Sequence, residues 1–353
     1  MNSSEELLSI CCLGYNHEKF LKDNLDSIKR IDYPHIEVIV VDDGSSDNSV
    51  SLLRDIQKDF PFELKIIAQK NTGNIGKNLN NAYHVAKGSL ITFISLDDVF
   101  NSKAILEEIK IMNANPKLAF VAAKKAVAIS NDGFINNNLP KLPIETINNP
   151  SLEELLEFDY SHFGAFYIQG AIFRKEIIDR IQGFDEDMTG DDIVLRTKLF
   201  REMICSGIWE YHFINYNNVF YRLHDNNIHK NSSRQIKIVT EYLEKYWPDR
   251  EDPKILIDWV CSIGRNKPLN EYLAVFSLNN RASSLLKNER IQKSISKSIS
   301  LEKFHFFKFI FTKKKIDRTT RQILLFNFIK INYKKNIKTN INNNCHFLDY
   351  NNE

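Results

Sequence analysis

Residues that interrupt or loosen a chain are scarce in this sequence, which has only 12 glycines and 9 prolines among 353 residues. Such a composition argues against long flexible linkers. No segment approaches the roughly 20 apolar residues that a membrane-spanning helix needs. The amino-terminal residues also lack the basic, apolar and small-residue pattern of a signal peptide. From these absences we expect a cytoplasmic protein.

Cysteine is scarce too, and its pattern argues against a disulfide framework. The five cysteines are an odd number, and they show neither CxxC nor another metal-ligand spacing. Cys11 and Cys12 lie within an apolar run, where packing in the core is the simpler interpretation. The set fits a reducing compartment.

Charge is nearly balanced overall but unevenly distributed along the chain. The formal net charge is +2, with 43% hydrophobic and 26% charged residues, which is ordinary for a globular protein. Residues 301–338 contain eleven Lys and Arg against two acids, Glu302 and Asp317, which gives this segment a charge of +9. The remainder therefore carries about −7, so we expect a neutral-to-acidic body with a basic tail.

Apolar runs alternate with segments of helical spacing through the first half of the chain. This order predicts a Rossmann-like α/β fold, with a mostly parallel sheet and helices on both faces. Residues 36–41 and 90–96 are almost continuously apolar, as buried parallel strands are. Each run leads into two adjacent carboxylates, Asp42-Asp43 and Asp97-Asp98. Ligands of open α/β sheets bind beyond the carboxyl ends of the strands, so both pairs should face one cleft.

Each carboxylate pair admits a functional and a plain structural interpretation. Asp97 and Asp98 could hold Mg²⁺ or Mn²⁺, which often take one or two carboxylates together with substrate phosphates. Asp42 and Asp43 could accept hydrogen bonds from a nucleoside, while Gly44 lets the backbone turn sharply. The alternatives are an acidic turn or helix cap after each strand.

Two later motifs add candidate groups to the same site. Asp191 and Asp192 open a predicted helix, where a carboxylate could act as a general base or only cap the helix. Arg222 and His224 end an aromatic strand, where they could contact phosphate or a metal. For a single histidine, packing is the stronger alternative.

The order of these motifs resembles family 2 of the glycosyltransferases, which have the GT-A fold, and in particular members that assemble bacterial surface polysaccharides. The resemblance spans roughly residues 7–230. It is carried by residues 9–16, 41–47, 74–76 with Asn80, 96–98, 182–186 with Asp191 and Asp192, and 221–224. Two positions depart from the usual pattern: Gly14 precedes the Tyr-Asn pair in place of Pro or Thr, and Asp191 replaces the commoner Glu.

The resemblance implies an inverting, metal-dependent transfer of one sugar from a nucleotide-diphosphate donor, expected to be UDP-linked, to a hydroxyl of a saccharide or lipid-linked acceptor. It implies a GT-A catalytic domain over residues 1–235, with nucleotide-sugar binding in 7–130 and acceptor binding in 131–235. The implied roles are catalysis for Asp192 and Asp191, Mn²⁺ or Mg²⁺ binding for Asp98 and His224, and donor binding for Leu13, Tyr15, Asp43, Asn74, Asn80, Asp97 and Arg222.

Two other functions remain open at this point. The chain could be a non-catalytic module that binds nucleotide sugars, although the presence of both Asp98 and Asp192 argues against that. It could also be a different Mg-dependent phosphoryl-transfer enzyme, but it lacks a P-loop GxxxxGK[ST]. No QxxRW motif of processive synthases follows residue 222, which favours the addition of a single sugar.

Residues 236–353 are expected to form a helical, basic C-terminal region. Apolar runs at 304–311 and 323–329 are flanked by lysines and are too short to span a bilayer. Such segments can lie on an anionic membrane surface, so we expect peripheral contact with the inner face of the cell membrane. The alternatives are packing onto the catalytic domain and nucleic-acid binding, and no nucleic-acid module supports the latter.

Overall fold

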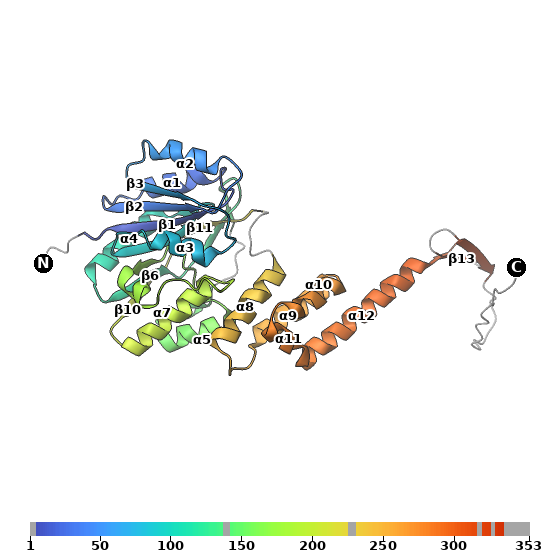
Figure 1. Ribbon diagram of the computed structural model, residues 1–353. Coiled ribbons are helices and arrows are strands. Elements are labelled where there is room, and N and C mark those ends of the chain that lie inside the picture. Colours follow the sequence, from blue (N-terminus) through green and yellow to red (C-terminus); the bar gives the residue numbers. More distant parts are fainter. Residues whose placement is uncertain (1–4, 137–141, 225–230, 316–319, 326–328, 335–353) are drawn as a thin grey trace.

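The computed structural model describes residues 5–136, 142–224, 231–315, 320–325 and 329–334. Figure 1 shows a sheet covered by helices, from which a set of helices leads away toward a small third sheet. Of the basic residues counted in 301–338, Arg318, Lys335 and Lys338 lie outside the described residues.

The central sheet has seven strands in the order β10-β6-β9-β4-β1-β2-β3. All neighbouring pairs are parallel except those of β9, which runs antiparallel to β4 and β6. The strands are β1 (Leu8–Gly14), β2 (Ile36–Asp42), β3 (Glu63–Ala68), β4 (Leu90–Ser95), β6 (Leu118–Ala123), β9 (Ile172–Arg174) and β10 (Glu210–Ile214). The predicted mostly parallel α/β sheet is therefore confirmed.

Helices cover both faces of this sheet, so two hydrophobic cores form. One core contains residues of α3, α6 and α7, and the other contains residues of α1, α2 and α4. Cys11 and Cys12 are both fully buried but belong to different cores, because successive residues of a strand point to opposite faces. The helices are α1 (Leu21–Lys29), α2 (Ser49–Gln57), α3 (Ile75–Tyr83), α4 (Ser102–Ala114), α5 (Leu152–His162), α6 (Lys175–Arg180) and α7 (Asp192–Ser206).

A second, four-stranded sheet has the order β5-β11-β7-β8. Its strands are β5 (Val99–Phe100), β7 (Val127–Ile129), β8 (Ile135–Asn136) and β11 (Val219–Arg222). The sequence pattern predicts one strand over 118–129. In the structure, strand β6 ends at Ala123, and a separate strand, β7, begins at Val127 in this second sheet. The interruption carries β7 beside β11, and β5 follows directly from the end of β4, so the two sheets meet near Asp97 and Asp98.

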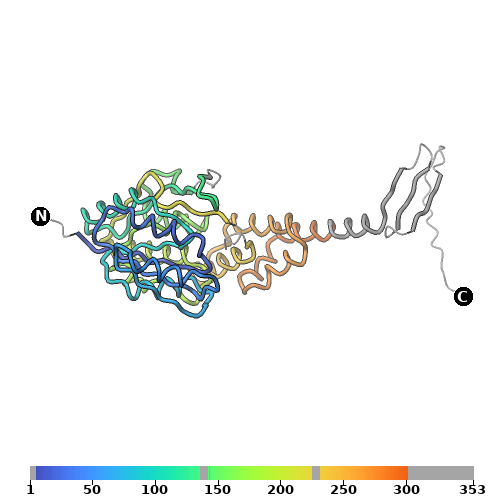
Figure 2. Tube along the Cα trace, turned by 90° about the horizontal axis from the view of Figure 1, so that it is seen from above, coloured from blue at the N-terminus to red at the C-terminus, as the bar shows by residue number. Residues whose placement is uncertain are grey.

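The C-terminal region is helical up to Ile310, as predicted for the extension. Its helices are α8 (Ser232–Tyr246), α9 (Lys254–Asn266), α10 (Leu269–Ala274), α11 (Asn280–Ser284) and α12 (Glu289–Ile310). The predicted boundary at residue 235 falls inside α8, and the division into domains stays a prediction. A third core joins residues of α8 and α9 to Ile193 and Val194 of α7, so the extension packs onto the sheet domain. Figure 2 shows these helices leading away from one end of that domain.

The prediction of a wholly helical C-terminal region is wrong for its last described part. β12 (Phe311–Lys315), β13 (Thr320–Leu325) and β14 (Ile329–Lys334) form an antiparallel sheet. In β14, apolar Ile329, Ile331 and Tyr333 alternate with polar residues, which is the period of a strand rather than a helix. No helix within the described ranges is both long and apolar enough to cross a membrane.

Candidate active site

The carboxyl ends of β4, β1 and β2 meet at one edge of the central sheet. The backbone N–H of Leu96 donates to the Leu13 carbonyl (2.9 Å), and that of Asp43 donates to the Gly14 carbonyl (2.8 Å). A Cβ at Gly14 would lie 2.6 Å from the Leu96 side chain, so glycine allows this close approach. The acids after β2 and β4 therefore flank the end of β1, as the sequence predicts.

Asp98 is almost fully buried beside the end of β11. Its Oδ1 accepts a hydrogen bond from the Arg222 backbone N–H (2.7 Å). Its Oδ2 is also buried and lacks a well-formed hydrogen bond within the described part of the chain. Burial and the neighbouring Asp97 raise the pKa of Asp98 well above its ordinary value. Asp98 thus holds an oxygen that is withdrawn from water and is available to a ligand.

Asp97 differs from its neighbour because two histidines stabilise its charge. Its Oδ2 lies 2.9 Å from His224 Nε2 and 3.8 Å from His17 Nε2. Burial opposes ionisation of Asp97, but the hydrogen bond from His224 and the nearby His17 outweigh it and lower its pKa. The Oδ1 atom of Asp97 is buried with no hydrogen-bond partner among the described residues. The two neighbouring acids therefore favour opposite protonation states.

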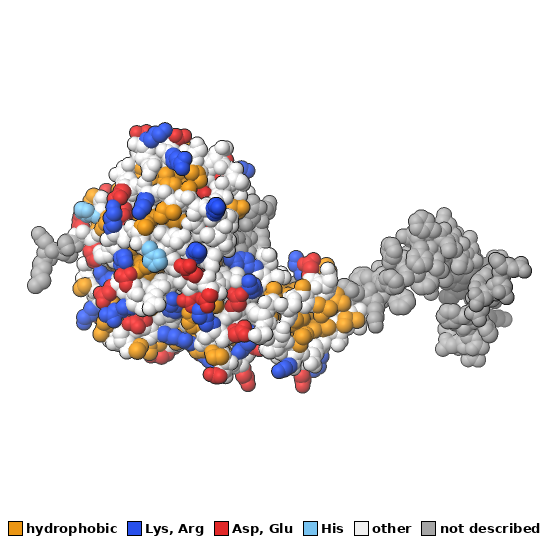
Figure 3. Space-filling view, in the orientation of Figure 1, with side chains coloured by type: hydrophobic (Ala, Val, Ile, Leu, Met, Phe, Trp, Pro, Cys, Tyr) orange, Lys and Arg blue, Asp and Glu red, His pale blue; other side chains and the backbone are white. Residues whose placement is uncertain are grey.

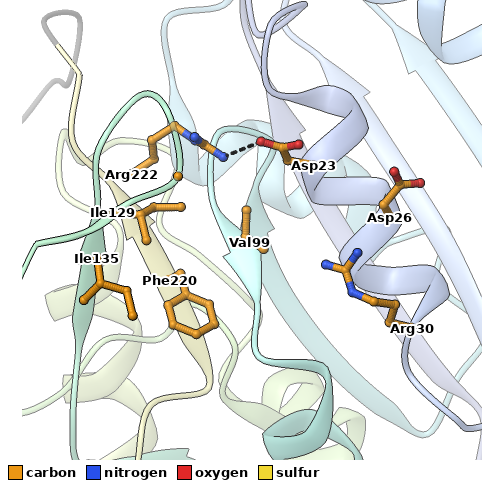
Figure 4. A pocket seen from close by; sticks show the side chains of 9 residues that line it. Asp23, Asp26, Arg30, Val99, Ile129, Ile135, Phe220 and Arg222 are labelled. Atoms are coloured by element: carbon orange, nitrogen blue, oxygen red, sulfur yellow. Dashed lines mark hydrogen bonds and ion pairs between the residues drawn. The ribbon is translucent and has the colours of Figure 1, made fainter.

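Arg222 holds Asp97 and Asp98 in place through hydrogen bonds from its backbone and its side chain. We expected its guanidinium in the donor site. Instead, Nε donates to the Asp97 carbonyl (2.8 Å), Nη1 to the carbonyls of residues 130–131 and Nη2 to Asp23 (2.9 Å). Figure 4 shows the guanidinium directed toward Asp23 on α1. Contact of Arg222 with the donor stays a prediction, and the structure adds a positioning role.

That guanidinium forms part of the wall of a cavity of about 340 Å³ on the side of α1. The cavity is lined by Asp23, Asp26, Arg30, Val99, Ile129, Gly133, Ile135, Phe220 and Arg222. Phe220 lines this cavity, whereas Tyr221 lines a smaller pocket with Tyr167 and Gln169. Alternate residues of β11 therefore face different sites.

Asp43 organises the loop that follows β3. Its Oδ1 accepts hydrogen bonds from the backbone N–H of Thr72 (2.7 Å) and from the Gln69 amide (3.1 Å), and its Oδ2 accepts from the Gly73 N–H (3.1 Å). Gly44 has a positive φ of 78°, and a Cβ there would lie 2.6 Å from the Asn71 nitrogen. The geometry of this turn thus depends on glycine, and Asp43 holds the loop after β3 in place beside the end of β2.

Asn74 and Asn80 connect α3 to the segment 183–186. Asn74 caps α3 through the Lys77 N–H (2.9 Å) and donates to the Glu186 carbonyl (2.6 Å). Asn80 accepts from the Phe184 N–H and donates to the Phe184 carbonyl, both at 2.9 Å. The structure therefore shows both amides binding protein backbone. Their contact with the donor, like that of Leu13 and the half-exposed Tyr15, stays a prediction.

Asp191 and Asp192 lie at the amino-terminal end of α7, as predicted. Burial and the adjacent Asp191 raise the pKa of Asp192 to about 7, while Arg196 acts in the opposite direction. Burial also raises the pKa of Asp191. A carboxylate that titrates near neutrality suits general base catalysis, because it can accept a proton and still be ionised at the working pH.

Residues 167–169 lie between Asp192 and the end of β4, which Asp97 and Asp98 follow. The ring of Tyr167 stacks on Tyr221, with centroids 6.1 Å apart and an interplanar angle of 6°. Asp192 and Asp98 both lie close enough to Tyr167 and to Tyr221 to raise the pKa of each phenol, after the larger effect of burial. The Ile168 N–H donates to Asp192, and the Ser95 N–H donates to Gln169 Oε1 (2.9 Å).

Sequence reasoning assigned no role to His17 and did not single out Tyr167 within its aromatic stretch. His17 comes directly after the Tyr-Asn pair that follows β1, and nothing in its spacing points to Asp97. Tyr167 ends an aromatic stretch, a signal that is shared by core residues. Its stacking on Tyr221 depends on a loop and a strand, β11, that are distant in sequence.

The fold and these clustered acids define the class of the protein as GT-A. TarS residues 1–349 of S. aureus align with 93% of this chain and 99% of that chain, at 16% identity and a TM-score of 0.52. A mannosyltransferase of Pyrobaculum calidifontis aligns with 86% of this chain and 88% of that chain, at 16% identity and a TM-score of 0.51. Residues 9–182, just under half of the chain, match the model of glycosyl transferase family 2, so this region is similar to that family.

Two curated relatives match about half of this chain at under 30% identity. Poly-beta-1,6-N-acetyl-D-glucosamine synthase of Staphylococcus epidermidis is 28% identical over 55% of this chain and 46% of its own length. GalNAc(5)-diNAcBac-PP-undecaprenol beta-1,3-glucosyltransferase of Campylobacter jejuni is 26% identical over 55% of this chain and 60% of its own. The chain thus spans about half of the curated relatives it matches.

Proposed function

We propose that the protein is an inverting, metal-dependent glycosyltransferase. It moves one sugar, a hexosyl or N-acetylhexosaminyl unit, from a UDP-linked donor to a hydroxyl of a saccharide or lipid-linked acceptor in surface-polysaccharide assembly. The observation that carries this proposal is the approach of Asp98 and Asp192 to the same stacked pair, Tyr167 and Tyr221. Asp98 is suited to binding a metal ion, and Asp192 is suited to accepting a proton.

The acids of β4 fit a hard divalent cation such as Mn²⁺ or Mg²⁺. Asp97 Oδ1 and Asp98 Oδ2 are buried carboxylate oxygens without a hydrogen-bond partner among the described residues. Across the described ranges no group of three or more His, Cys, Asp or Glu residues is placed to hold an ion. Asp98 would therefore bind the ion with help from His224 or Asp97 and from the donor's phosphates. When bound, the ion would neutralise charge on the departing diphosphate.

Asp192 supplies the proton acceptor in this proposal. It removes the proton from the acceptor hydroxyl as that oxygen attacks the anomeric carbon, and the bond to the donor phosphate breaks. A single displacement attacks the face opposite the leaving group, so the configuration inverts. Burial and the adjacent Asp191 at the helix start together keep the pKa of Asp192 raised.

The printed names of related structures guide the choice of donor and acceptor. The S. aureus structure contains UDP-GlcNAc, and the P. calidifontis structure contains GDP-Man and Mn²⁺. The name of the C. jejuni relative describes a lipid-linked acceptor. These names support a nucleotide-sugar donor and a lipid-linked acceptor.

Calorimetry with nucleotide diphosphates in the presence of Mn²⁺ tests the proposal first. UDP is expected to bind more tightly than GDP, and Asp98→Asn should weaken Mn²⁺-dependent UDP binding by at least about tenfold, since one charged ligand of the ion is lost. Asp192→Asn should keep UDP binding and abolish sugar transfer. Asp258→Asn, in the helical extension, is the matched control and should change neither.

Each alternative function gives a different result in the same assays. UDP binding without turnover by the unaltered chain would indicate a binding module. Appearance of a phosphorylated acceptor, in place of a glycosylated one, would indicate phosphoryl transfer. Wild-type turnover by Asp192→Asn would show that the base is misassigned.

A further inference from the structure

Helix α7 carries a buried arginine one turn after Asp192. Arg196 is 2% exposed, and its partner Asp159 on α5 is fully buried. Nε of Arg196 donates to Asp159 Oδ1 (3.0 Å), and Nη1 donates to the Phe166 carbonyl (2.7 Å). An ion pair this deeply buried seldom stabilises a fold more than apolar side chains of the same shape would, which points to another role.

The same pair fixes the loop that carries Tyr167. Asp159 Oδ1 also accepts from the Ala165 N–H (3.2 Å), and Arg196 bonds the carbonyl of residue 166. The next residue, Tyr167, stacks on Tyr221, and the one after it donates its N–H to Asp192. The Arg196–Asp159 pair therefore connects the stacked rings to the helix that presents the acid.

Arg196 also acts on Asp192 directly. Its Nη1 lies 3.8 Å from Asp192 Oδ2. Other charged or titratable groups that act on Asp192 are Asp191 on the same turn, Tyr167 in the loop and Tyr221 on β11, and Arg234 of α8 acts on Asp191. Arg196 is the nearby cation, and Asp159 partly neutralises it.

We propose that Asp159 and Arg196 are positioning residues that hold Asp192 and Tyr167 in register and set the charge of Asp192. This inference rests on the proposed function, in which Asp192 is the catalytic base. It makes a prediction that packing alone does not make. Removal of the cation and removal of its counter-charge should shift the titration of Asp192 in opposite directions.

Carbon-13 NMR of the full chain labelled at aspartate carboxyl carbons tests this without any substrate. The Asp192 resonance is assigned by its loss in Asp192→Asn, and wild-type Asp192 should titrate near pH 7. Asp159→Asn keeps an acceptor for Arg196 but leaves its charge uncompensated, so Asp192 should titrate about one unit lower. The double variant Asp159→Asn/Arg196→Gln removes both charges as a neutral pair, so Asp192 should titrate about one unit higher.

Arg281→Gln is the matched control because Arg281 also bonds one aspartate, Asp252, and two backbone carbonyls, but in the helical extension. It should leave the Asp192 titration unchanged. Unchanged titration in both test variants, or shifts in the same direction, would overturn the positioning role. That outcome with an inactive Asp192→Asn would reject this inference alone, whereas an active Asp192→Asn would reject the proposed base.

Discussion

Glu108 on α4 shows how strongly burial acts on one carboxyl group away from the acids of the candidate site. It is fully buried, its Oε1 accepts from Asn218 (2.9 Å), and its Oε2 has no partner within the described residues. Burial raises the pKa of Glu108 well above its ordinary value. The native state therefore holds a proton that the unfolded chain releases, and stability must fall as pH rises above the unfolded pKa.

We expect Glu108→Gln to remove part of this pH dependence. The amide keeps an acceptor for Asn218 and has no charge to bury. Compared with the wild type, the variant should gain thermal stability progressively from pH 5 to pH 8, with a Tm about 2 °C higher or more at pH 8. Thermal melts at several pH values measure this, with Glu153→Gln, an exposed acid on α5, as control. A constant difference between variant and wild type would contradict the assignment.

For single residues, the sequence identifies the acids of the candidate site more reliably than it identifies the side chains around them. Asp97, Asp98 and Asp192 are recognisable because they follow an apolar strand or open a helix. The hydrogen-bond partners of Arg222 and Asn80 cannot be recognised in the sequence, because they depend on which loop tertiary packing brings near each side chain. Arg222 meets Asp23, nearly 200 positions away in sequence, and Asn80 meets Phe184.

Among the elements, α3 depends on its contact with the segment 183–186. Asn80 satisfies both the N–H and the carbonyl of Phe184 in a buried position. Asn80→Ala should therefore lower the free energy of unfolding by about 1–3 kcal/mol, since two buried backbone groups lose their partners. Urea unfolding measures the loss. Asn81→Ala, which removes one half-buried hydrogen bond to Gln69, should cost less than Asn80→Ala, and an equal cost would argue against this role.

Strands β2 and β4 of the central sheet were predictable because buried parallel strands are continuous apolar runs. The interruption between Ala123 and Val127 was not predictable, because the residues on both sides of it are apolar and only the strands they pair with differ. Strands 311–334 were missed for another reason. Their lysines and apolar residues suit an amphipathic surface helix as well as a strand, and local pattern alone decides weakly between them.

The whole molecule separates its charges along its length. The chain outside residues 301–338 carries about −7 and that segment +9. Exposed apolar side chains lie in the neighbouring helical extension, among them Leu273, Leu286 and Ile299. Figure 3 shows apolar side chains gathered on this part of the surface. An anionic membrane would attract the basic segment while offering an apolar surface to the extension.

We therefore expect the full chain to bind vesicles that contain anionic lipid and a variant truncated after Ser300 to be released from them. Replacement of Lys313, Lys314 and Lys315 by Gln should weaken binding roughly 100-fold, because each surface lysine contributes about 1 kcal/mol. Co-sedimentation measures this, with neutral phosphatidylcholine vesicles as control. Binding should also fall as salt rises, since these charges are screened. Equal partitioning of the full chain, the truncated variant and the Gln variant would leave the basic segment without a membrane role.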